Sequence, residues 1–344
     1  MADSQRNLTI ADIARLAGVG VGTASRALNN APGVSAATRQ RVLAVADQHA
    51  YVISPDASGL AAGRTGRIGL VVPHIDRWFF GTMVGEIESV LRAAGLDVLL
   101  YDVGGLDDRR EFFEQLPARK KVDAVVVVAF PVEEAERQRL TLLGVHIVAA
   151  GGQHAVYPHV CIDDYVAGRQ AVDHLISLGH RSIGMIEAVD PEQPVRPSGR
   201  TAAYHRALAD AGIAPDPDLV VTTNWGGING AEAMARLLSL SHRPTAVYAH
   251  SDEVAAGAMR TIRRTGLRIP EDISIVGIDD HPMAELLDLT TVHQPVAEQG
   301  RAAAGLVLDL LRNDTPPADQ AITLPTHLVV RRSTTSVPPT PDPS

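Results

Sequence analysis

From residue 67 onward, short apolar runs of strand length alternate with stretches of helical period. The runs form two series, the first at 68–73, 97–103, 122–130, 146–150 and 159–162, and the second at 182–188, 219–223, 246–250 and 274–278. Strands and helices that alternate in this way form parallel sheets covered by helices on both faces. The sequence therefore predicts an α/β fold whose doubly wound parallel-sheet core has two subdomains that face each other across a cleft.

The first 50 residues differ from the rest, because they have helical period and no strand pattern. Thr9 with Asp12 three residues later is typical of a capping box, and an apolar helical face follows at 10–17. A second short helix is predicted at 23–29, and Ser35 can cap a third. Three short helices with a glycine-containing turn between the first two predict an all-α helix-turn-helix head.

A further short helix is predicted just before the strand–helix alternation begins. Ser54 can cap it, Pro55 suits its first position, Asp56 places an acid in the first turn, and Gly63 ends it. A helix this short is marginal by itself. We therefore expect it to be ordered by a binding partner.

The net charge of −9 argues against nucleic-acid binding when the chain is taken whole. The charge is unevenly distributed, however, because residues 1–66 carry six arginines, four aspartates and no glutamate. That segment is therefore +2 and the remainder is −11. Such asymmetry favours a separate module at the N-terminus that faces nucleic acid.

Several classes of function lack their sequence signatures. The single cysteine, Cys161, excludes an internal disulfide and a cysteine-built zinc site. The glycines at 18–22 do not form a dinucleotide-binding loop, because Thr23 replaces the third glycine and no strand precedes them. No HExxH, GxSxG or phosphate-loop motif occurs. We expect no enzyme activity, no catalytic residue, no bound metal and no cofactor.

No apolar run approaches the ~18–20 residues that a membrane span needs. The segment 1–7 is polar and carries no secretory signal. These features predict a cytoplasmic protein without membrane contact.

Two pairs of adjacent acids follow predicted strands, Asp163 with Asp164 and Asp279 with Asp280. They are poor general acid/base pairs, because neighbours on a strand point to opposite faces. The first member of each pair can bind a ligand, since ligands of parallel sheets lie at the carboxyl ends of the strands. A helix-capping or hinge role is the alternative.

Motifs along nearly the whole chain resemble the lactose/galactose-repressor family. Residues 8–19 and 23–29 closely resemble its DNA-binding head, and 63–65 resemble the junction between head and core. Signatures of its core occur at 178–181, 269–274, 276–280 and 289–292. The resemblance implies a transcriptional regulator, a repressor, whose affinity for a pseudo-palindromic DNA operator is controlled by a small-molecule effector, a sugar, between the core subdomains. It also implies a homodimer, and the proline-rich C-terminal segment favours a dimer over a tetramer.

This resemblance gives a domain division. The expected parts are a helix-turn-helix head at 1–53, a hinge helix and linker at 54–66, a core N-subdomain at 67–163 plus 292–323, a core C-subdomain at 164–291 plus 324–334, and a disordered tail at 335–344.

The second helix of such a head enters the major groove of DNA. Arg26 can donate two hydrogen bonds to guanine, whereas Val21 can contact only an apolar group such as a thymine methyl. By position in the family, the expected DNA-binding residues are Thr9, Val21, Gly22, Thr23, Ser25, Arg26, Asn29, Ser35, Ala57 and Leu60, with Thr38 a further phosphate contact. Thr9 and Ser35 are alternatively helix caps, and Leu60 is expected to wedge between bases in the minor groove.

The resemblance also implies a set of effector-binding residues in the core. Arg200 and Asp279 can bracket adjacent hydroxyls, and Trp225 can stack on the apolar face of a sugar. The full expected set is Phe79, Phe80, Arg200, Trp225, Ser251, Asp279 and Gln294. Core packing is an equal alternative for the two phenylalanines.

A sugar-binding receptor with no DNA-binding role is the alternative function, because such receptors share a two-subdomain core. The helical head and the missing secretory signal argue against it. An enzyme on a doubly wound sheet is disfavoured by the absence of catalytic motifs.

Overall fold

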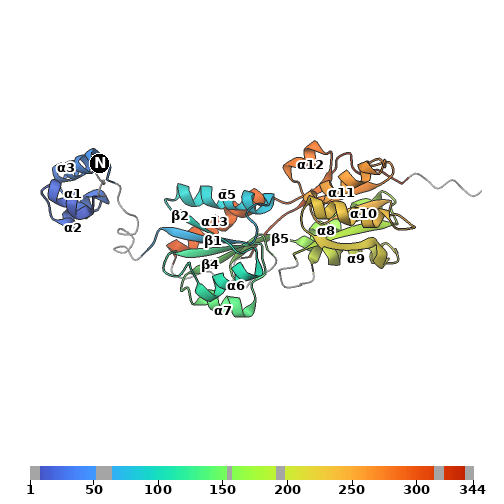
Figure 1. Ribbon diagram of the computed structural model, residues 1–344, viewed down its shortest axis with the longest axis horizontal. Coiled ribbons are helices and arrows are strands. Elements are labelled where there is room, and N and C mark those ends of the chain that lie inside the picture. Colours follow the sequence, from blue (N-terminus) through green and yellow to red (C-terminus); the bar gives the residue numbers. More distant parts are fainter. Residues whose placement is uncertain (1–7, 52–63, 153–156, 191–197, 314–320, 338–344) are drawn as a thin grey trace, which may run out of the picture. The chain divides into compact units, whose positions relative to one another are not determined.

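The computed structural model describes residues 8–51, 64–152, 157–190, 198–313 and 321–337. It divides into two compact units, one of residues 1–66 with 120–123 and one of the remainder. The described helices and strands confirm the predicted combination of an all-α head and an α/β core with two sheets (Figure 1).

The head consists of α1 (Ile10–Leu16), α2 (Val21–Leu28) and α3 (Ala36–Gln48). Its core is made mostly of small side chains, which let the helices approach closely: Ile13, Ala14, Ala17, Ala24, Ala27, Val42 and Ala46. The predicted capping box is present, with the Thr9 amide donating to Asp12 Oδ2 at 3.0 Å and the Asp12 amide donating to Thr9 Oγ1 at 3.4 Å. The hydrogen bonds that Thr9 donates to the Asp12 carboxylate lower the pKa of Asp12 to about 2.

The first sheet of the core has the strand order β11-β5-β4-β3-β1-β2. Its strands pair in parallel throughout and are β1 (Arg67–Val72), β2 (Asp97–Asp102), β3 (Ala124–Val128), β4 (His146–Ala150), β5 (His159–Ile162) and β11 (Ala321–Leu324). Helices α5 (Trp78–Ala93) and α13 (Val296–Arg312) cover one face, and α6 (Leu106–Gln115) and α7 (Glu134–Thr141) lie on the other (Figure 1). The central strand β3 is buried at every residue, as expected for a strand covered on both faces.

The second sheet has the order β12-β10-β9-β8-β6-β7. Its strands are β6 (Ile183–Val189), β7 (Val220–Asn224), β8 (Ala246–Ala249), β9 (Ser274–Asp279), β10 (Thr290–His293) and β12 (His327–Val329), and only β12 runs antiparallel to its neighbour. Separate apolar clusters join the sheet to the helix pair α8 (Asp164–Ser177) and α9 (Gly199–Asp210), and to the pair α10 (Gly227–Leu238) and α11 (Asp252–Arg264). The short helices η1 (Pro217–Leu219) and α12 (Pro282–Leu286) complete this half.

Glycines let α10 and α11 pack backbone to backbone. A Cβ at Gly257 would overlap the carbonyl of Gly227, and one at Gly230 would overlap the carbonyl of Val254. Such close approach is the specific reason for glycine at these helix positions, where it is otherwise unfavourable.

Two predicted boundaries are wrong by a few residues. Val292 and His293 were expected in the N-subdomain, but both belong to β10, which pairs with β9 in the second sheet. Leu324 was expected in the C-subdomain, but it pairs with Ile162 in the first sheet. The edge strands β11 and β12 and the strand β10 fall outside the runs predicted from the sequence.

The predicted disordered tail at 335–344 is wrong for its first three residues. The Thr335 amide donates to Ser274 Oγ at 3.0 Å, and the Val337 amide donates to the Leu178 carbonyl at 3.0 Å. The His180 ring also contacts the Thr335 carbonyl at 3.0 Å. These contacts fix the segment on the second half of the core, and residues 338–344 lie outside the described chain.

The predicted hinge helix at 54–63 lies outside the described residues. Beyond it, the amides of Thr65 and Gly66 donate to the Asp123 carboxylate at 2.6 and 2.8 Å. Among the described helices, none is both long enough and apolar enough to cross a membrane.

Candidate functional site

The second helix of the head exposes one face that matches the predicted DNA-reading residues. Val21 is 48% exposed, and Gly22, Arg26 and Asn29 are also exposed, while Thr23 and Ser25 are half-buried. The opposite face buries Ala24 and Ala27 against α1 and α3. The helix therefore presents these side chains outward, where a DNA groove can reach them. Arg26 lies along the helix, with Nε donating to the Gly22 carbonyl at 3.2 Å.

The hydroxyls expected to contact phosphate also stabilise the helices. Thr9 caps α1, and Ser35 Oγ accepts from the Thr38 amide at 3.3 Å while donating to Thr38 Oγ1 at 2.9 Å. Gly20 caps α2 without a side chain. Ala57 and Leu60 lie outside the described residues, so the minor-groove wedge stays a prediction.

Two arginines of the head have a structural role that the sequence pattern did not indicate. Arg39 donates to the Ala27 and Ala31 carbonyls at 3.1 and 2.6 Å, near the C-terminus of α2. Arg41 Nε donates to the Ala17 carbonyl at 3.0 Å. A cation at a helix C-terminus satisfies carbonyls that have no partner within the helix. The carbonyl groups that these two arginines bind are eight to 24 residues away in the chain, so the local sequence pattern does not predict the contacts.

In the core, Asp279 lies at the carboxyl end of β9, with φ at 130°, a conformation that is rare for any residue but glycine. Its side chain accepts a hydrogen bond of 2.5 Å from Gln294 Nε2, and the residue is only 7% exposed. Burial raises the pKa of Asp279 to about 7, against the opposing effect of the nearby Arg200. The strained backbone and the buried carboxyl mark this strand end as a site rather than a packing surface.

Arg200, on α9, is held from two sides. Its Nε donates to Asp164 Oδ1 at 2.8 Å, and its Nη1 donates to the His250 carbonyl. Burial lowers the pKa of Arg200, but the charges of Asp164 and Asp279 outweigh that effect and raise it. The guanidinium therefore stays charged and carries its own counter-ion.

The two acids of the pair after β5 have different roles. The first of the pair after β5, Asp163, caps α8 by accepting from the Tyr165 and Val166 amides at 2.9 and 3.0 Å. The second, Asp164, binds Arg200. For the first acid of this pair the helix-capping alternative is confirmed, and the second acid contacts α9.

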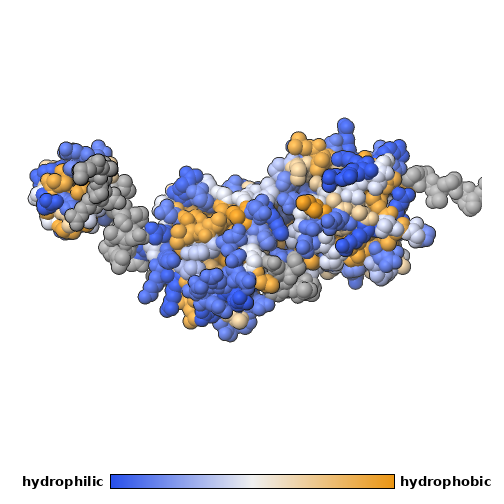
Figure 2. Space-filling view, in the orientation of Figure 1, coloured by the Kyte–Doolittle hydropathy of each residue, from blue (hydrophilic) through white to orange (hydrophobic). Residues whose placement is uncertain are grey.

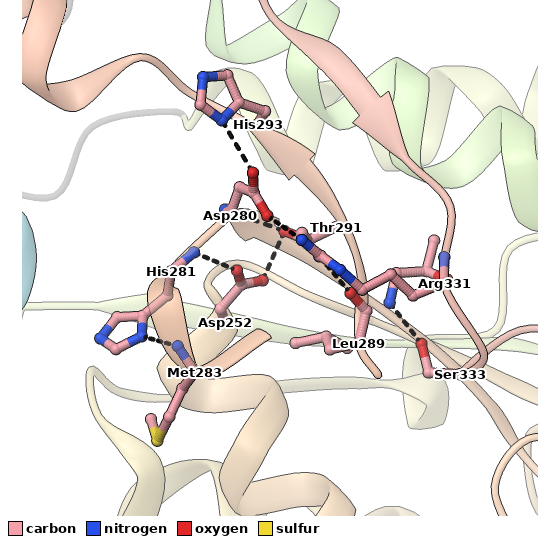
Figure 3. A network of polar contacts seen from close by, with 10 residues as sticks. Asp252, Asp280, His281, Met283, Leu289, Thr291, His293, Arg331 and Ser333 are labelled. Atoms are coloured by element: carbon pink, nitrogen blue, oxygen red, sulfur yellow. Dashed lines mark hydrogen bonds and ion pairs between the residues drawn. The ribbon is translucent and has the colours of Figure 1, made fainter. Parts of the chain in front are cut away.

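Around the other acid pair, a polar network joins β9, β10, α11 and the C-terminal segment (Figure 3). Asp280 accepts from the His293 ring at 3.0 Å and from Arg331 Nη2 at 2.7 Å. Asp252 accepts from the His281 amide at 2.9 Å and from Thr291 Oγ1 at 2.6 Å. Burial, together with the charge of Asp279, raises the pKa of Asp252. Ser251, predicted to bind the effector, is buried and caps α11 by accepting from the Val254 amide at 3.3 Å.

For Phe79 and Phe80, the alternative of core packing is confirmed. Phe80 is part of the apolar core of the first sheet, and Phe79 packs against that core. Trp78, one residue earlier, instead contacts the His281 ring with 4.8 Å between ring centroids. Trp225 is half-buried against the apolar cluster of α10 and α11. The sequence prediction missed Trp78, because its contact with His281, about 200 residues away, leaves no local signal.

A pocket connects the start of α5 and the start of α13 with the ends of β9 and β10. It is lined by Trp78, Thr82, Asp279, Asp280, His293, Gln294, Pro295, Val296, Ala297, Glu298 and Arg301. Of the predicted effector residues it includes Asp279 and Gln294. Arg200 lies near enough to act on the charge of Asp279, whereas Phe79, Phe80, Trp225 and Ser251 are not part of the pocket wall. Elsewhere in the described ranges, no group of three or more His, Cys, Asp or Glu side chains is arranged to hold a metal ion.

Residues 9–54 match the family described as bacterial regulatory proteins, lacI family, and residues 172–334 match the periplasmic binding protein-like domain. The chain is 32% identical to the HTH-type transcriptional regulator DegA of Bacillus subtilis over 95% of its own length and 98% of that protein. The chain belongs to the lacI family. It is also 32% identical to the HTH-type transcriptional repressor CytR of Escherichia coli, over 96% of this chain and 97% of the repressor.

Solved structures of lacI-family proteins have the same fold as this lacI-family chain. A lac repressor dimer bound to operator and an anti-inducer has a TM-score of 0.85 at 26% identity, covering 96% of this chain and all of that one. A complex of the transcriptional regulator CelR with cellobiose has a TM-score of 0.70 at 31% identity, covering 95% of this chain and 99% of that one. The predicted family, the fold and the function as a DNA-binding transcriptional regulator are thereby confirmed. Because the lacI-family match covers α1 to α3, the alternative of a receptor without DNA binding is wrong.

Proposed function

We propose that this lacI-family protein represses transcription by binding a pseudo-palindromic operator as a homodimer in the cytoplasm, and that a sugar bound beside Asp279 changes its operator affinity. The observation that carries the proposal is the combination of an outward-facing recognition helix with a buried polar pocket on the core. A DNA-reading surface and a ligand site in one chain are the two sites that allosteric control requires.

The DNA half of the proposal rests on the exposed face of α2. Arg26 supplies donors for guanine, and Val21 supplies an apolar contact. Thr9, Ser25, Ser35 and Thr38 are assigned to phosphates, which position the head without reading sequence. With Gly20 and Gly22 offering no side chain at the start of α2, direct readout depends on few residues.

Exposed apolar residues on the core support the homodimer. Leu286 and Met283 of α12 are 84% and 39% exposed, Leu100 on the edge strand β2 is 45% exposed, and apolar surface gathers over both elements (Figure 2). Clustered exposed apolar side chains typically mark protein interfaces. A second copy of the chain is the proposed occupant, since the similar lac repressor structure is described as a dimer.

The effector half rests on the chemistry of the pocket. Asp279 and Gln294 offer an acceptor and an amide to hydroxyl groups, and Trp78 offers an aromatic face to the apolar side of a sugar ring. Arg200 is assigned a contact to the same ligand because it lies within electrostatic reach of Asp279. Similar proteins bind sugars, namely CelR with cellobiose and a regulator of Enterococcus faecium with ribose, the latter at 29% identity and a TM-score of 0.69, covering 79% of this chain and all of that one.

Gel-shift titration of DNA fragments upstream of the chain's own gene, with and without a panel of sugars, tests the proposal. We expect nanomolar binding to at least one fragment at about 0.1 M salt, and a change of tenfold or more in that affinity with one sugar. A chain that binds no fragment, or whose operator affinity no sugar changes, would contradict the proposal.

A further inference from the structure

Arg200, the arginine assigned to the effector, is paired with an acid of the same chain. Arg200 and Asp164 form an ion pair of 2.8 Å whose side chains are only 11% and 23% exposed. The second contact of Arg200, from Nη1, goes to the uncharged His250 carbonyl. Nε and Nη1 are thus engaged, and Nη2 makes no hydrogen bond to any described residue. The pair offers a ligand hydrogen-bond donors without a net positive charge.

Two other described arginines near the pocket also form ion pairs. Arg331 binds Asp280 at 2.7 Å, and Arg301, which lines the pocket, binds Glu86 at 2.8 Å. The cation that a ligand meets in the pocket wall is therefore already paired with an acid.

Two buried carboxyl groups lie at the same site. Asp279 and Asp252 are both buried, and burial together with the charge of Asp279 raises the pKa of Asp252. Asp252 receives its two hydrogen bonds from a backbone amide and a hydroxyl, neither of which carries charge. Burial of the carboxyls raises the pKa of both aspartates, so the site already resists the negative charge that it has. A phosphate or carboxylate group brought into the site would lose its water and meet only arginines that already have an acidic partner. This loss of hydration without a free cation is strongly unfavourable.

We propose that Asp164 is a specificity-determining residue, which neutralises Arg200 so that the site selects an uncharged sugar and rejects the phosphate ester of the same sugar. This inference rests on the proposed function, namely that a sugar binds beside Asp279. Asp164 acts through Arg200 and requires no contact with the ligand.

Isothermal titration of the full-length chain with matched pairs tests the selection directly. Suitable pairs are ribose with ribose 5-phosphate, glucose with glucose 6-phosphate, and fructose with fructose 1-phosphate. For the pair that contains the best ligand, we expect the free sugar to bind at least about tenfold more tightly than its ester, because the ester carries an uncompensated charge. An ester that binds as tightly as its parent sugar, or more tightly, overturns the inference and leaves the proposed function intact.

The variant Asp164→Asn tests the residue itself. Asparagine keeps the shape and one acceptor oxygen but removes the charge, so Arg200 loses its ion-pair partner and keeps only the neighbouring charge of Asp279. We expect the preference for sugar over ester to fall by about tenfold or more, since one charge pair in a buried site changes affinity on this scale. The matched control is Asp173→Asn on the same helix, which removes the same charge from an exposed carboxylate bound to Arg169. It should leave the preference unchanged.

A conservative variant separates charge from structural damage. Asp164→Glu retains the carboxylate and should restore most of the preference that Asp164→Asn loses. An unchanged preference in folded Asp164→Asn, or an equal loss in Asp173→Asn, overturns the role of Asp164. If neither member of any pair changes operator affinity in the gel shift, the proposed function fails, and this result is distinct from tight binding of an ester.

Discussion

The two sheets of the core have the same arrangement, yet the carboxyl ends of their strands differ in chemistry. In both, the strand order places the first two strands of the half at one edge and a late strand at the other. In the first sheet, β1, β3, β4 and β5 end in buried apolar residues, Val72, Val128, Ala150 and Ile162, whereas the edge strand β2 ends in Asp102. In the second sheet, β7, β9 and β10 end in Asn224, Asp279 and His293, whereas β6 and β8 end in Val189 and Ala249.

The two sheets have equivalent edges where their strands end, but the second sheet places a buried aspartate, Asp279, at that edge. Ligands of parallel sheets bind beyond the carboxyl ends of the strands, so either half could hold one. In the pocket wall the second half supplies Asp279, Asp280 and His293, while the first half supplies Trp78 and Thr82 of α5 and the start of α13 with Glu298 and Arg301. The second half therefore provides the buried carboxyl of Asp279, and the first half provides an aromatic side chain together with charged residues.

The largest expected effect comes from removing the buried cation of the second half. Arg200→Ala leaves Asp164 without its partner, so we expect a loss of about 2–4 kcal/mol in the free energy of unfolding, together with loss of the effector response. Urea unfolding and the gel shift with sugar measure the two effects. Arg169→Ala, which breaks more exposed pairs, is the control. A fully stable Arg200→Ala chain that still responds to sugar would show that the second half does not depend on this arginine for stability or for effector recognition.

The next effect concerns the pH dependence caused by Asp279. An unfolded aspartate loses its proton near pH 3.8 and the folded Asp279 near pH 7, so the folded state binds more protons between these values. This carboxyl therefore lowers stability as the pH rises from about 4 to about 7. Asp279→Asn removes the effect, and its stability relative to the natural chain should rise across that window and level off above it. Effector affinity should fall by about a hundredfold, because the ligand loses a charged acceptor.

Thermal or urea unfolding at several pH values checks this difference. His250 has the opposite slope, since burial lowers its pKa from 6.5 to about 4, but it is present in both chains and cancels. A stability difference between the two chains that does not change with pH would mean that Asp279 has the same pKa in the folded and unfolded states, and so that burial does not raise it.

A mutation at the corresponding end of the first sheet should affect stability alone. Val128→Ala removes two buried methyl groups, and we expect a loss of about 1–2 kcal/mol in the free energy of unfolding with unchanged effector affinity. Urea unfolding and titration with the best sugar measure both quantities. A change in effector affinity comparable to that of Asp279→Asn would show that the first half also recognises the ligand.

The smallest effect is expected at Trp78 in the pocket wall. Trp78→Phe keeps an aromatic ring but reduces the contact area, so effector affinity should fall by roughly three- to tenfold with little change in stability. Phe80→Leu, a conservative change on the same helix but in the apolar core, serves as the control and should leave affinity unchanged. If Trp78→Phe binds the effector as tightly as the natural chain does, the indole ring of Trp78 does not contribute to effector affinity.

The sequence predicted most of the architecture because hydrophobic period and capping residues act locally. The capping box at Thr9, the caps at Ser35 and the buried strand β3 all follow from neighbours within a few residues. The same local reasoning left capping and ligand binding open for Asp163, because either acid of an adjacent pair can cap a helix and only the position of α9 decides which one reaches Arg200. It also missed Trp78 and the attachment of Thr335 to Ser274.

By itself, the sequence determined the all-α head, the alternation that builds two sheets and the family to which the chain belongs. Each depends on residues close together in the chain, where helix and strand periods constrain which side chains are buried. Only the tertiary structure decided which carboxylate neutralises Arg200, which aromatic residue lines the pocket and which sheet end is polar. These depend on contacts between residues 36 to more than 200 positions apart, and local patterns carry no information about such pairings.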